Sequence, residues 1–234
     1  MCCGGKREIR ERIWRLMDDK HVSRFPFPIE GRTPNFEGAD IAAGRLLDVN
    51  PFLEAEVVKV NPDYAQVDVR RNVLKTRKTL IMPTPRLKAG FLVLEPDKIP
   101  EGQVNYAATI KGSNRYGEKL EITKLPEVDL IVCGSVAITK NGRRIGKGGG
   151  YSDLEFAILL EAGLIEEEIP IATTIHELQL VKDAPVDTHD FTVDIISTPK
   201  RVIATSGPVQ RPRGIIWEKL GEERLENIPI LKKI

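Results

Sequence analysis

The chain has few cysteines, no long hydrophobic run and no excess of either charge. Its mean hydropathy is −0.22, and no apolar stretch approaches the roughly 20 residues that a membrane-spanning helix needs. The three cysteines are too few for a disulfide framework, and the first residues lead into a charged segment without the pattern of a signal peptide. We therefore expect a cytoplasmic protein in a reducing compartment, with no membrane partner. The net charge of +1 argues against a bulk nucleic-acid binder.

Both common nucleotide-binding motifs are also absent. A P-loop ends in Lys followed by Ser or Thr, and neither residue type follows Lys147. The dinucleotide fingerprint Gly-x-Gly-x-x-Gly can be started at Gly146, but the acidic residue expected on the next strand is missing. A nucleotide that binds this chain must therefore use a different arrangement.

Residues 142–153 read Gly-Arg-Arg-Ile-Gly-Lys-Gly-Gly-Gly-Tyr-Ser-Asp, and this Gly-rich run is the most informative part of the chain. Glycine lets successive backbone N–H groups approach one anion, and the cations of the run add positive charge. A helix predicted to begin near Ser152 would add the dipole of its N-terminus, and Asp153 could hold a divalent metal beside phosphates. A flexible, solvated loop is the alternative. The apolar strand predicted at 128–138 and the apolar helix predicted at 154–164 favour a phosphate site.

Hydrophobic periodicity predicts strands that alternate with helices. Helices are expected at 7–19, 37–47, 67–75 and 154–164, and strands at 56–60, 78–82, 91–94, 128–138, 170–175, 179–181, 191–197 and 201–205. This alternation indicates an α/β protein with three layers, α/β/α, around a mostly parallel central sheet. Ligands of such sheets bind beyond the carboxyl ends of the strands, where the Gly-rich run falls. We expect one domain over 1–206 and a C-terminal extension, 207–234, that packs on it through Trp217 and the apolar residues 228–231.

The Gly-rich run resembles the signature of the 5-formyltetrahydrofolate cyclo-ligase (methenyltetrahydrofolate synthetase) family, Gly-x-Arg-Leu-Gly-x-Gly-x-Gly-Tyr-Tyr-Asp. The matching positions are Gly142, Arg144, Gly146, Gly148, Gly150, Tyr151 and Asp153. The opening Lys6-Arg-Glu-Ile-Arg10 and the late segment His189-Asp190-Phe-Thr-Val-Asp194 also resemble that family, so the likeness extends over about residues 6–200. The segment Met82-Pro-Thr-Pro-Arg86-Leu is similar to the family's divergent branch of methenyltetrahydrofolate synthetase domain-containing proteins.

The resemblance implies a cyclo-ligase-like fold and an ATP-dependent ligase that forms a C–N bond. In that family ATP phosphorylates the formyl oxygen of 5-formyltetrahydrofolate, and ring closure then expels phosphate. For this chain it implies ATP and Mg²⁺ as cofactors and a folate or another small heterocycle as substrate, with a monomer and a homodimer both open.

The resemblance also implies the site residues. Those assigned to ATP are Lys6, Arg10, Arg144, Gly146, Lys147, Gly148, Gly149, Gly150, Tyr151, Ser152 and Asp153. Among them, Arg144 and Lys147 would be the catalytic cations. Asp153 and Asp190 would hold the metal. The residues expected at the second substrate are Asn61, Gln66 and Tyr151.

The folate half of the site departs from the family pattern, while the phosphate half is kept. Gln66 stands where the family has an acidic residue that binds the pterin, Thr139 replaces an acid, and Ser152 replaces a tyrosine. An amide offers one acceptor where a carboxylate accepts two N–H bonds, a loss that can cost about 1–3 kcal/mol. Two alternatives therefore stay open: an ATP-dependent enzyme acting on another heterocycle, such as a thiamine-related compound, and a non-catalytic nucleotide-binding protein.

Three other features have simple explanations. The basic stretch at 70–78 is a local hint of nucleic-acid or polyglutamate binding, and a solvated helix face explains it equally well. His176 and His189 stand where acid–base chemistry is conceivable, but we favour structural roles for both. The adjacent Cys2 and Cys3 have no nearby third ligand, which argues against a metal site there.

Overall fold

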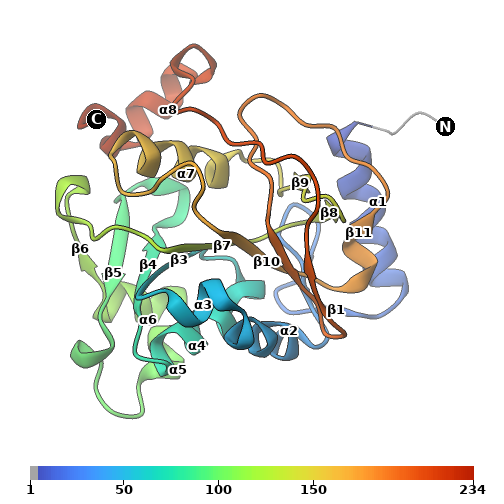
Figure 1. The fold of residues 1–234 in the computed structure, drawn as a ribbon, viewed down its shortest axis with the longest axis horizontal. Helices are drawn as coiled ribbons and strands as arrows, with labels where there is room; N and C mark the ends of the chain where they lie inside the picture. The colour runs from blue at the N-terminus through green and yellow to red at the C-terminus, as the bar shows by residue number, and fades with distance from the viewer. Residues whose placement is uncertain (1–4) are drawn as a thin grey trace.

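The computed structural model describes residues 5–234, and its centre is an eight-stranded sheet (Figure 1). The strand order across the sheet is β13 (Val202–Ala204), β12 (Ile195–Ser197), β10 (Ile171–Thr174), β7 (Leu130–Cys133), β3 (Val57–Val60), β4 (Thr79–Pro83), β5 (Phe91–Leu94) and β6 (Glu118–Lys119). The strands β12, β10, β7, β3 and β4 run parallel, and β13, β5 and β6 pair antiparallel at the two edges. The predicted α/β class with a mostly parallel sheet is confirmed.

Both faces of this sheet are covered by helices, because successive side chains of a strand point to opposite sides. In β7, Leu130 and Val132 enter one hydrophobic core, whereas Ile131 and Cys133 enter the other. The first core is covered by α2 (Ala39–Arg45), α3 (Asn50–Glu54), α4 (Val67–Lys75), α5 (Val104–Ala107) and α6 (Ile110–Tyr116). The second is covered by α7 (Tyr151–Glu161) and the end of the chain (Figure 1). Within residues 5–234, no helix has both the length and the apolar character that crossing a bilayer requires.

The first helix, α1 (Lys6–Asp19), packs against a second, smaller sheet. The strand order of that sheet is β11 (Leu180–Val181), β8 (Ala137–Thr139) and β9 (Arg144–Ile145). Ile9, Ile13 and Met17 recur at helical spacing and bury one side of α1 in a core that includes Ile145. The short strands β1 (Ser23–Arg24) and β2 (Asn35–Phe36) form an antiparallel pair of their own. Because β9 lies within the Gly-rich run, this core ties α1 to that run.

The prediction of one strand over 128–138 is wrong. β7 ends at Cys133 in the central sheet, and β8 begins at Ala137 in the small sheet. The chain changes sheets at Gly134, where a Cβ atom would lie only 2.8–3.0 Å from side-chain atoms of three neighbouring residues. The apolar pattern runs almost unbroken through this point, so hydrophobicity alone could not show the change of sheet.

The C-terminal extension crosses α7 and ends in the core beneath it. Ile228, Ile230 and Leu231 are buried in the same hydrophobic cluster as the apolar residues of α7. A short helix of the extension, α8 (Glu222–Asn227), lies above α7 (Figure 1). Trp217, which we expected to pack with them, stays 39 % exposed. The extension therefore packs on the body through its last apolar residues.

Cys2 and Cys3 lie outside the described residues.

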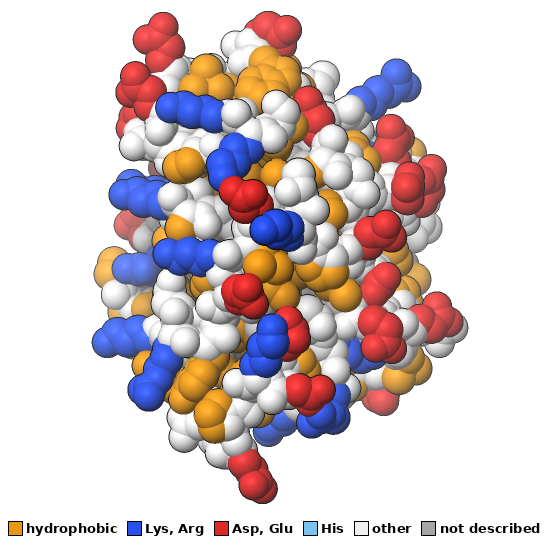
Figure 2. Space-filling view, turned by 90° about the vertical axis from the view of Figure 1, so that its left-hand side faces the viewer, with side chains coloured by type: hydrophobic (Ala, Val, Ile, Leu, Met, Phe, Trp, Pro, Cys, Tyr) orange, Lys and Arg blue, Asp and Glu red, His pale blue; other side chains and the backbone are white. Residues whose placement is uncertain are grey.

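The edge of the central sheet at β6 is short and charged. The strand has only two residues, Glu118 and Lys119, and so short and charged an edge discourages pairing with another chain. Figure 2 shows the face of the molecule on this side, where Lys and Arg, Asp and Glu, and hydrophobic side chains all reach the surface.

Most cations of the basic stretch at 70–78 are paired within the chain, while Lys75 and Arg77 stay exposed; the nucleic-acid and polyglutamate interpretations remain predictions. Arg70 is 1 % exposed, and its guanidinium donates to backbone carbonyls. Arg71 pairs with Asp68, Arg77 pairs with Asp97, and Lys78 donates to the Ala55 carbonyl. Folding thus places these cations on partners within the chain.

Candidate nucleotide site

A cleft of about 720 Å³ opens where β3, β4 and β7 end. Its walls include residues 61–63 after β3, residues 84–86 after β4, and Gly134 after β7. Parallel strands bring their carboxyl ends to one edge of the sheet, so loops distant in sequence meet there. A ligand site is predicted at this edge of the sheet.

The Gly-rich run forms one wall of the cleft. It leaves β9 at Ile145, passes through residues 146–150 and enters α7 at Tyr151, one residue before the predicted helix start. Gly148 and Gly150 have φ angles of 108° and 63°, a region that side-chain-bearing residues rarely adopt. Every residue predicted to contact ATP lines this cleft: Lys6, Arg10, Arg144, Gly146, Lys147, Gly148, Gly149, Gly150, Tyr151, Ser152 and Asp153.

Two cations reach the cleft from α1. Lys6 and Arg10 stand four residues apart and therefore share one face of the helix. Lys6 Nζ pairs with Asp190 and lies 2.7 Å from an Asp187 carboxylate oxygen. This hydrogen bond lowers the pKa of Asp187. Arg10 Nε donates to the Gly146 carbonyl at 2.6 Å, so α1 holds both the Gly-rich run and the acidic side of the cleft.

Arg144 is an almost enclosed cation at the base of the Gly-rich run. Its side chain is 4 % exposed; a terminal guanidinium nitrogen lies 3.9 Å from Asp153, and the guanidinium carbon lies 4.7 Å from the centre of the Phe191 ring. Burial acts to lower the pKa of Arg144, but Asp153 and other anionic groups around it raise that pKa overall. Its Nε atom is buried with no hydrogen-bond partner among the described residues. A rigid cation with an unused donor suits an anionic ligand.

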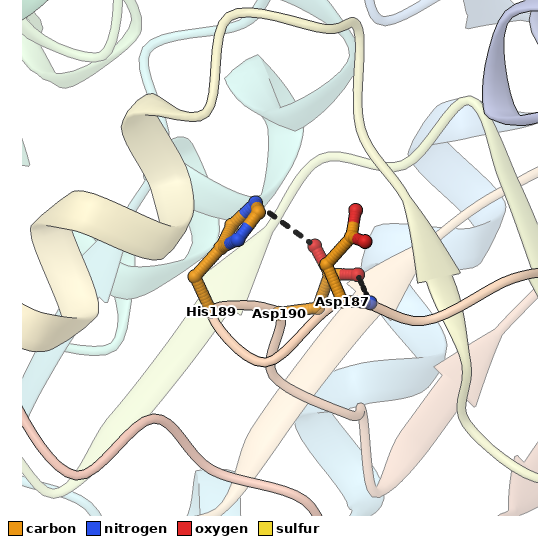
Figure 3. Close-up of side chains that lie close together, drawn as sticks. All are labelled: Asp187, His189 and Asp190. Carbon is orange, nitrogen blue, oxygen red and sulfur yellow. Dashed lines mark hydrogen bonds and ion pairs between the residues drawn. The ribbon is translucent and has the colours of Figure 1, made fainter. Parts of the chain in front are cut away.

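Acidic side chains also gather at the cleft. One ligand atom from each of Asp187, His189 and Asp190 lies within 4.8 Å of the others, and Figure 3 shows these side chains side by side on one loop. His189 Nε2 is 3.7 Å from an Asp190 carboxylate oxygen. Asp153 lines the same cleft from α7. Carboxylate oxygens are the ligands that Mg²⁺ prefers, and the donors that cluster here are those of Asp187, His189 and Asp190. Asp153 lies outside this cluster, so its predicted sharing of a metal with Asp190 stays a prediction.

A buried polar network lies beneath the cleft, and the sequence analysis missed it. Lys59 on β3 and Glu155 on α7 form an ion pair whose side chains are 2 % and 4 % exposed. Burial raises the pKa of Glu155, and Lys59 opposes this shift. Asn61 Nδ2 donates to Glu155 at 3.2 Å and to the Ser152 hydroxyl at 2.9 Å. The network thus fixes Asn61 and Ser152, two residues predicted at the site. A lysine within a strand and an acid within an apolar helix were the available signals.

Asp63 is a second residue that the sequence analysis missed. Its carboxylate lies 2.6 Å from Lys147 Nζ and joins the loop after β3 to the Gly-rich run. The buried Arg70 holds this loop by donating to the carbonyls of Asn61 and Asp63, and burial lowers the pKa of Arg70 to about 10. The structure therefore places Lys147 on a carboxylate at the cleft rather than free in solvent.

Two of the positions that depart from the family pattern do not border the cleft. Gln66 is fully buried, its amide nitrogen donates to Thr174, and its Oε1 has no partner among residues 5–234. Thr139 is buried in β8 and bonds to Asn141 and to the backbone N–H of Arg143. Ser152 alone of the three departures faces the cleft.

The two histidines lie in different places. His176 caps a 3-10 turn by accepting the Leu178 N–H on Nδ1, at a position outside the cleft. His189 lines the cleft beside Asp190.

The C-terminal extension also reaches the Gly-rich run, which nothing in the sequence analysis predicted. Arg224 Nη2 donates to the Gly149 carbonyl at 2.7 Å, and its guanidinium carbon lies 5.4 Å from the centre of the Tyr151 ring. The run is therefore held by one arginine from each end of the chain, Arg10 and Arg224.

Comparisons with known proteins find relatives over almost the whole chain. The model of the 5-formyltetrahydrofolate cyclo-ligase family matches residues 3–199. The methenyltetrahydrofolate synthase domain-containing proteins of Homo sapiens and Danio rerio are 41 % and 38 % identical to this chain over 98 % of its length. The chain spans 61 % of the length of each of those relatives.

A solved structure shows the same fold. The 5,10-methenyltetrahydrofolate synthetase of Aquifex aeolicus aligns with a TM-score of 0.54 and 19 % identity, covering 87 % of this chain and 94 % of that one. The family match extends over most of the chain and includes the Gly-rich run, which lies at the cleft. This chain belongs to the 5-formyltetrahydrofolate cyclo-ligase family.

Proposed function

We propose that the cleft binds MgATP and transfers its terminal phosphoryl group to a formyl or carbonyl oxygen of a small heterocycle, which activates that carbon for ring closure. In the reaction of the family, the heterocycle is 5-formyltetrahydrofolate and the product is 5,10-methenyltetrahydrofolate. The observation that supports the proposal most directly is the meeting of the Gly-rich run with Lys6, Arg10 and Arg144 in one cleft. Catalysis of phosphoryl transfer requires mainly that the reacting groups are positioned and that the charge on the phosphates is neutralised, and these residues can do both.

Each group has a distinct part in the proposal. Backbone N–H groups of residues 146–150 cradle the phosphates, and the planar guanidinium of Arg144 binds phosphate oxygens in a way that lysine would match less well. Lys147 exchanges the Asp63 carboxylate for a phosphate oxygen. Asp153 and Asp190 offer oxygen ligands to Mg²⁺, which neutralises phosphate charge when it is bound.

Titration calorimetry with MgATP tests this proposal. Arg144→Met keeps much of the buried side-chain volume but removes the cation, and it should weaken MgATP binding by about 1.5–3 kcal/mol, the usual contribution of a hydrogen bond to a charged group. Arg143→Ala is the matched control, because the neighbouring Arg143 pairs with Asp183 and does not line the cleft. Absence of MgATP binding by the wild-type protein would contradict the proposal.

A non-folate heterocycle is the second candidate substrate, and Ser152 favours it. Its hydroxyl lies in the cleft, held by Asn61, where the family signature has a tyrosine. ATP-dependent formation of methenyltetrahydrofolate, followed by its absorbance, separates the two candidates. Rapid formation at micromolar 5-formyltetrahydrofolate would remove the second candidate, and tight ATP binding without this product would favour it. Tight ATP binding with no turnover of any heterocycle would instead leave a nucleotide-binding protein.

A further inference from the structure

A second pocket of about 210 Å³ adjoins the Gly-rich run on the side of the C-terminal extension. Residues that line both this pocket and the main cleft are Gly148, Gly150, Asp153 and His189. Its other walls come from α7, through Leu154 and Ala157, and from residues 212–224 of the extension. The family match ends at residue 199, so this part of the wall lies outside the family model.

The extension is anchored where it forms this wall. The backbone N–H of Ile215 donates to Glu161 at 3.0 Å, near the end of α7. Lys219 Nζ lies 2.9 Å from the Thr188 hydroxyl, on the loop that carries the acidic cluster. Arg224 closes the wall by donating to the Gly149 carbonyl. Three contacts along the segment therefore hold it against both α7 and the cleft.

The bond from Arg224 also sets the direction of a backbone donor. The carbonyl of Gly149 and the N–H of Gly150 belong to one planar trans peptide, in which the two groups point in opposite directions. Holding the carbonyl on the extension directs the Gly150 N–H away from it. Arg10 holds the Gly146 carbonyl in the same way, so the two arginines orient peptide units near both ends of residues 146–150.

We propose that the C-terminal extension completes the nucleotide site: the small pocket takes the nucleoside part of the nucleotide, and Arg224 positions the Gly-rich run for the phosphates. This inference rests on the proposed function. A volume of about 210 Å³ is smaller than the roughly 300–1,000 Å³ of pockets that hold whole ligands, which suits one part of a ligand whose remainder lies in the main cleft. The apolar walls offered by Leu154, Ala157 and Ile216 suit a flat base.

The test compares binding of MgATP with binding of magnesium tripolyphosphate, which has the phosphates without the nucleoside. Ala157→Leu fills the pocket and should weaken MgATP binding about tenfold or more while leaving tripolyphosphate binding unchanged. Ile216→Ser removes part of the apolar wall of the pocket at a half-buried position of the extension, and it should also weaken MgATP binding without changing tripolyphosphate binding. This second variant keeps the test usable if the buried Ala157 tolerates no larger side chain. Arg213→Ala is the control, since this exposed residue of the same segment does not line the pocket.

Arg224 acts through the run and should behave differently. Arg224→Ala should weaken both ligands about tenfold, and Arg224→Lys should recover part of that loss because a lysine can still reach the Gly149 carbonyl. Equal weakening of both ligands by Ala157→Leu and Ile216→Ser, or no weakening of MgATP by either, would overturn the pocket assignment alone. Wild-type protein that binds neither ligand would instead overturn the proposed function and this inference with it.

Discussion

Breaking the buried ion pair between Lys59 and Glu155 should destabilise the protein far more than breaking an exposed pair. The two side chains are 2 % and 4 % exposed, so neither charge can be solvated if its partner is lost. Lys59→Met would leave the Glu155 carboxylate without a cation, a change that typically costs about 3–5 kcal/mol. Domains are usually stable by only about 5–15 kcal/mol, so this one change would remove a large fraction of the free energy of unfolding.

Urea unfolding followed by tryptophan fluorescence measures the effect. The matched control is Lys98→Met, because Lys98 pairs with Glu95 at 2.8 Å while both side chains are about half exposed. That control should cost less than about 1 kcal/mol. The double variant Lys59→Met/Glu155→Leu should recover most of the loss, since two apolar side chains can replace a buried pair. A Lys59→Met variant no less stable than Lys98→Met, or a double variant no better than the single one, would refute this reasoning.

The pH dependence of the same variant gives an independent check. Burial raises the pKa of Glu155 above its ordinary value of 4.5, and removing Lys59 takes away the main opposing influence. The folded variant then keeps a proton that the unfolded chain releases above pH 4.5, so its stability should fall as the pH rises from that value. Urea midpoints for Lys59→Met should therefore be higher at about pH 5 than at about pH 8, relative to wild type.

Two further predictions concern residues outside the cleft. Burial lowers the pKa of His176, and its Nδ1 accepts the Leu178 N–H, so its contribution to stability is present above pH 6.5 and lost as the pH falls below that value. Between about pH 7.5 and about pH 5.5, the melting temperature should fall further for wild type than for His176→Asn, whose amide oxygen can accept the Leu178 N–H at either pH. Equal falls in melting temperature would count against this role of His176. Gln66→Glu, which restores the acidic residue of the family, should cost about 2 kcal/mol because it places a carboxylate at a fully buried position near the Asp63 carboxylate. Calorimetric melting that finds this variant as stable as wild type would show that Gln66 lies in a more polar setting than its burial indicates.

The sequence by itself determined the fold class and the Gly-rich wall of the cleft. Alternating apolar segments predict layered helices and strands because each element must bury one face, and β3, α4, β4 and β5 lie within one residue of their predicted bounds. The Gly-rich run could be recognised because residues 146–150 are adjacent in the chain and their chemistry needs no distant partner to be visible. Lys6 and Arg10 were found by their order relative to that run, and both reach the cleft.

Only the tertiary structure decided which groups meet across the sheet. The pairs Lys59–Glu155 and Lys147–Asp63 join residues 96 and 84 positions apart, and no local pattern encodes such a distance. The break at Gly134 depends on crowding by neighbours from other loops, and the position of Gln66 beneath the cleft depends on how α4 packs. The contact from Arg224 exists because the extension crosses α7 before its last apolar residues enter the core. Burial and long-range pairing are properties of the packed chain, so these parts of the site had to be read from the structure.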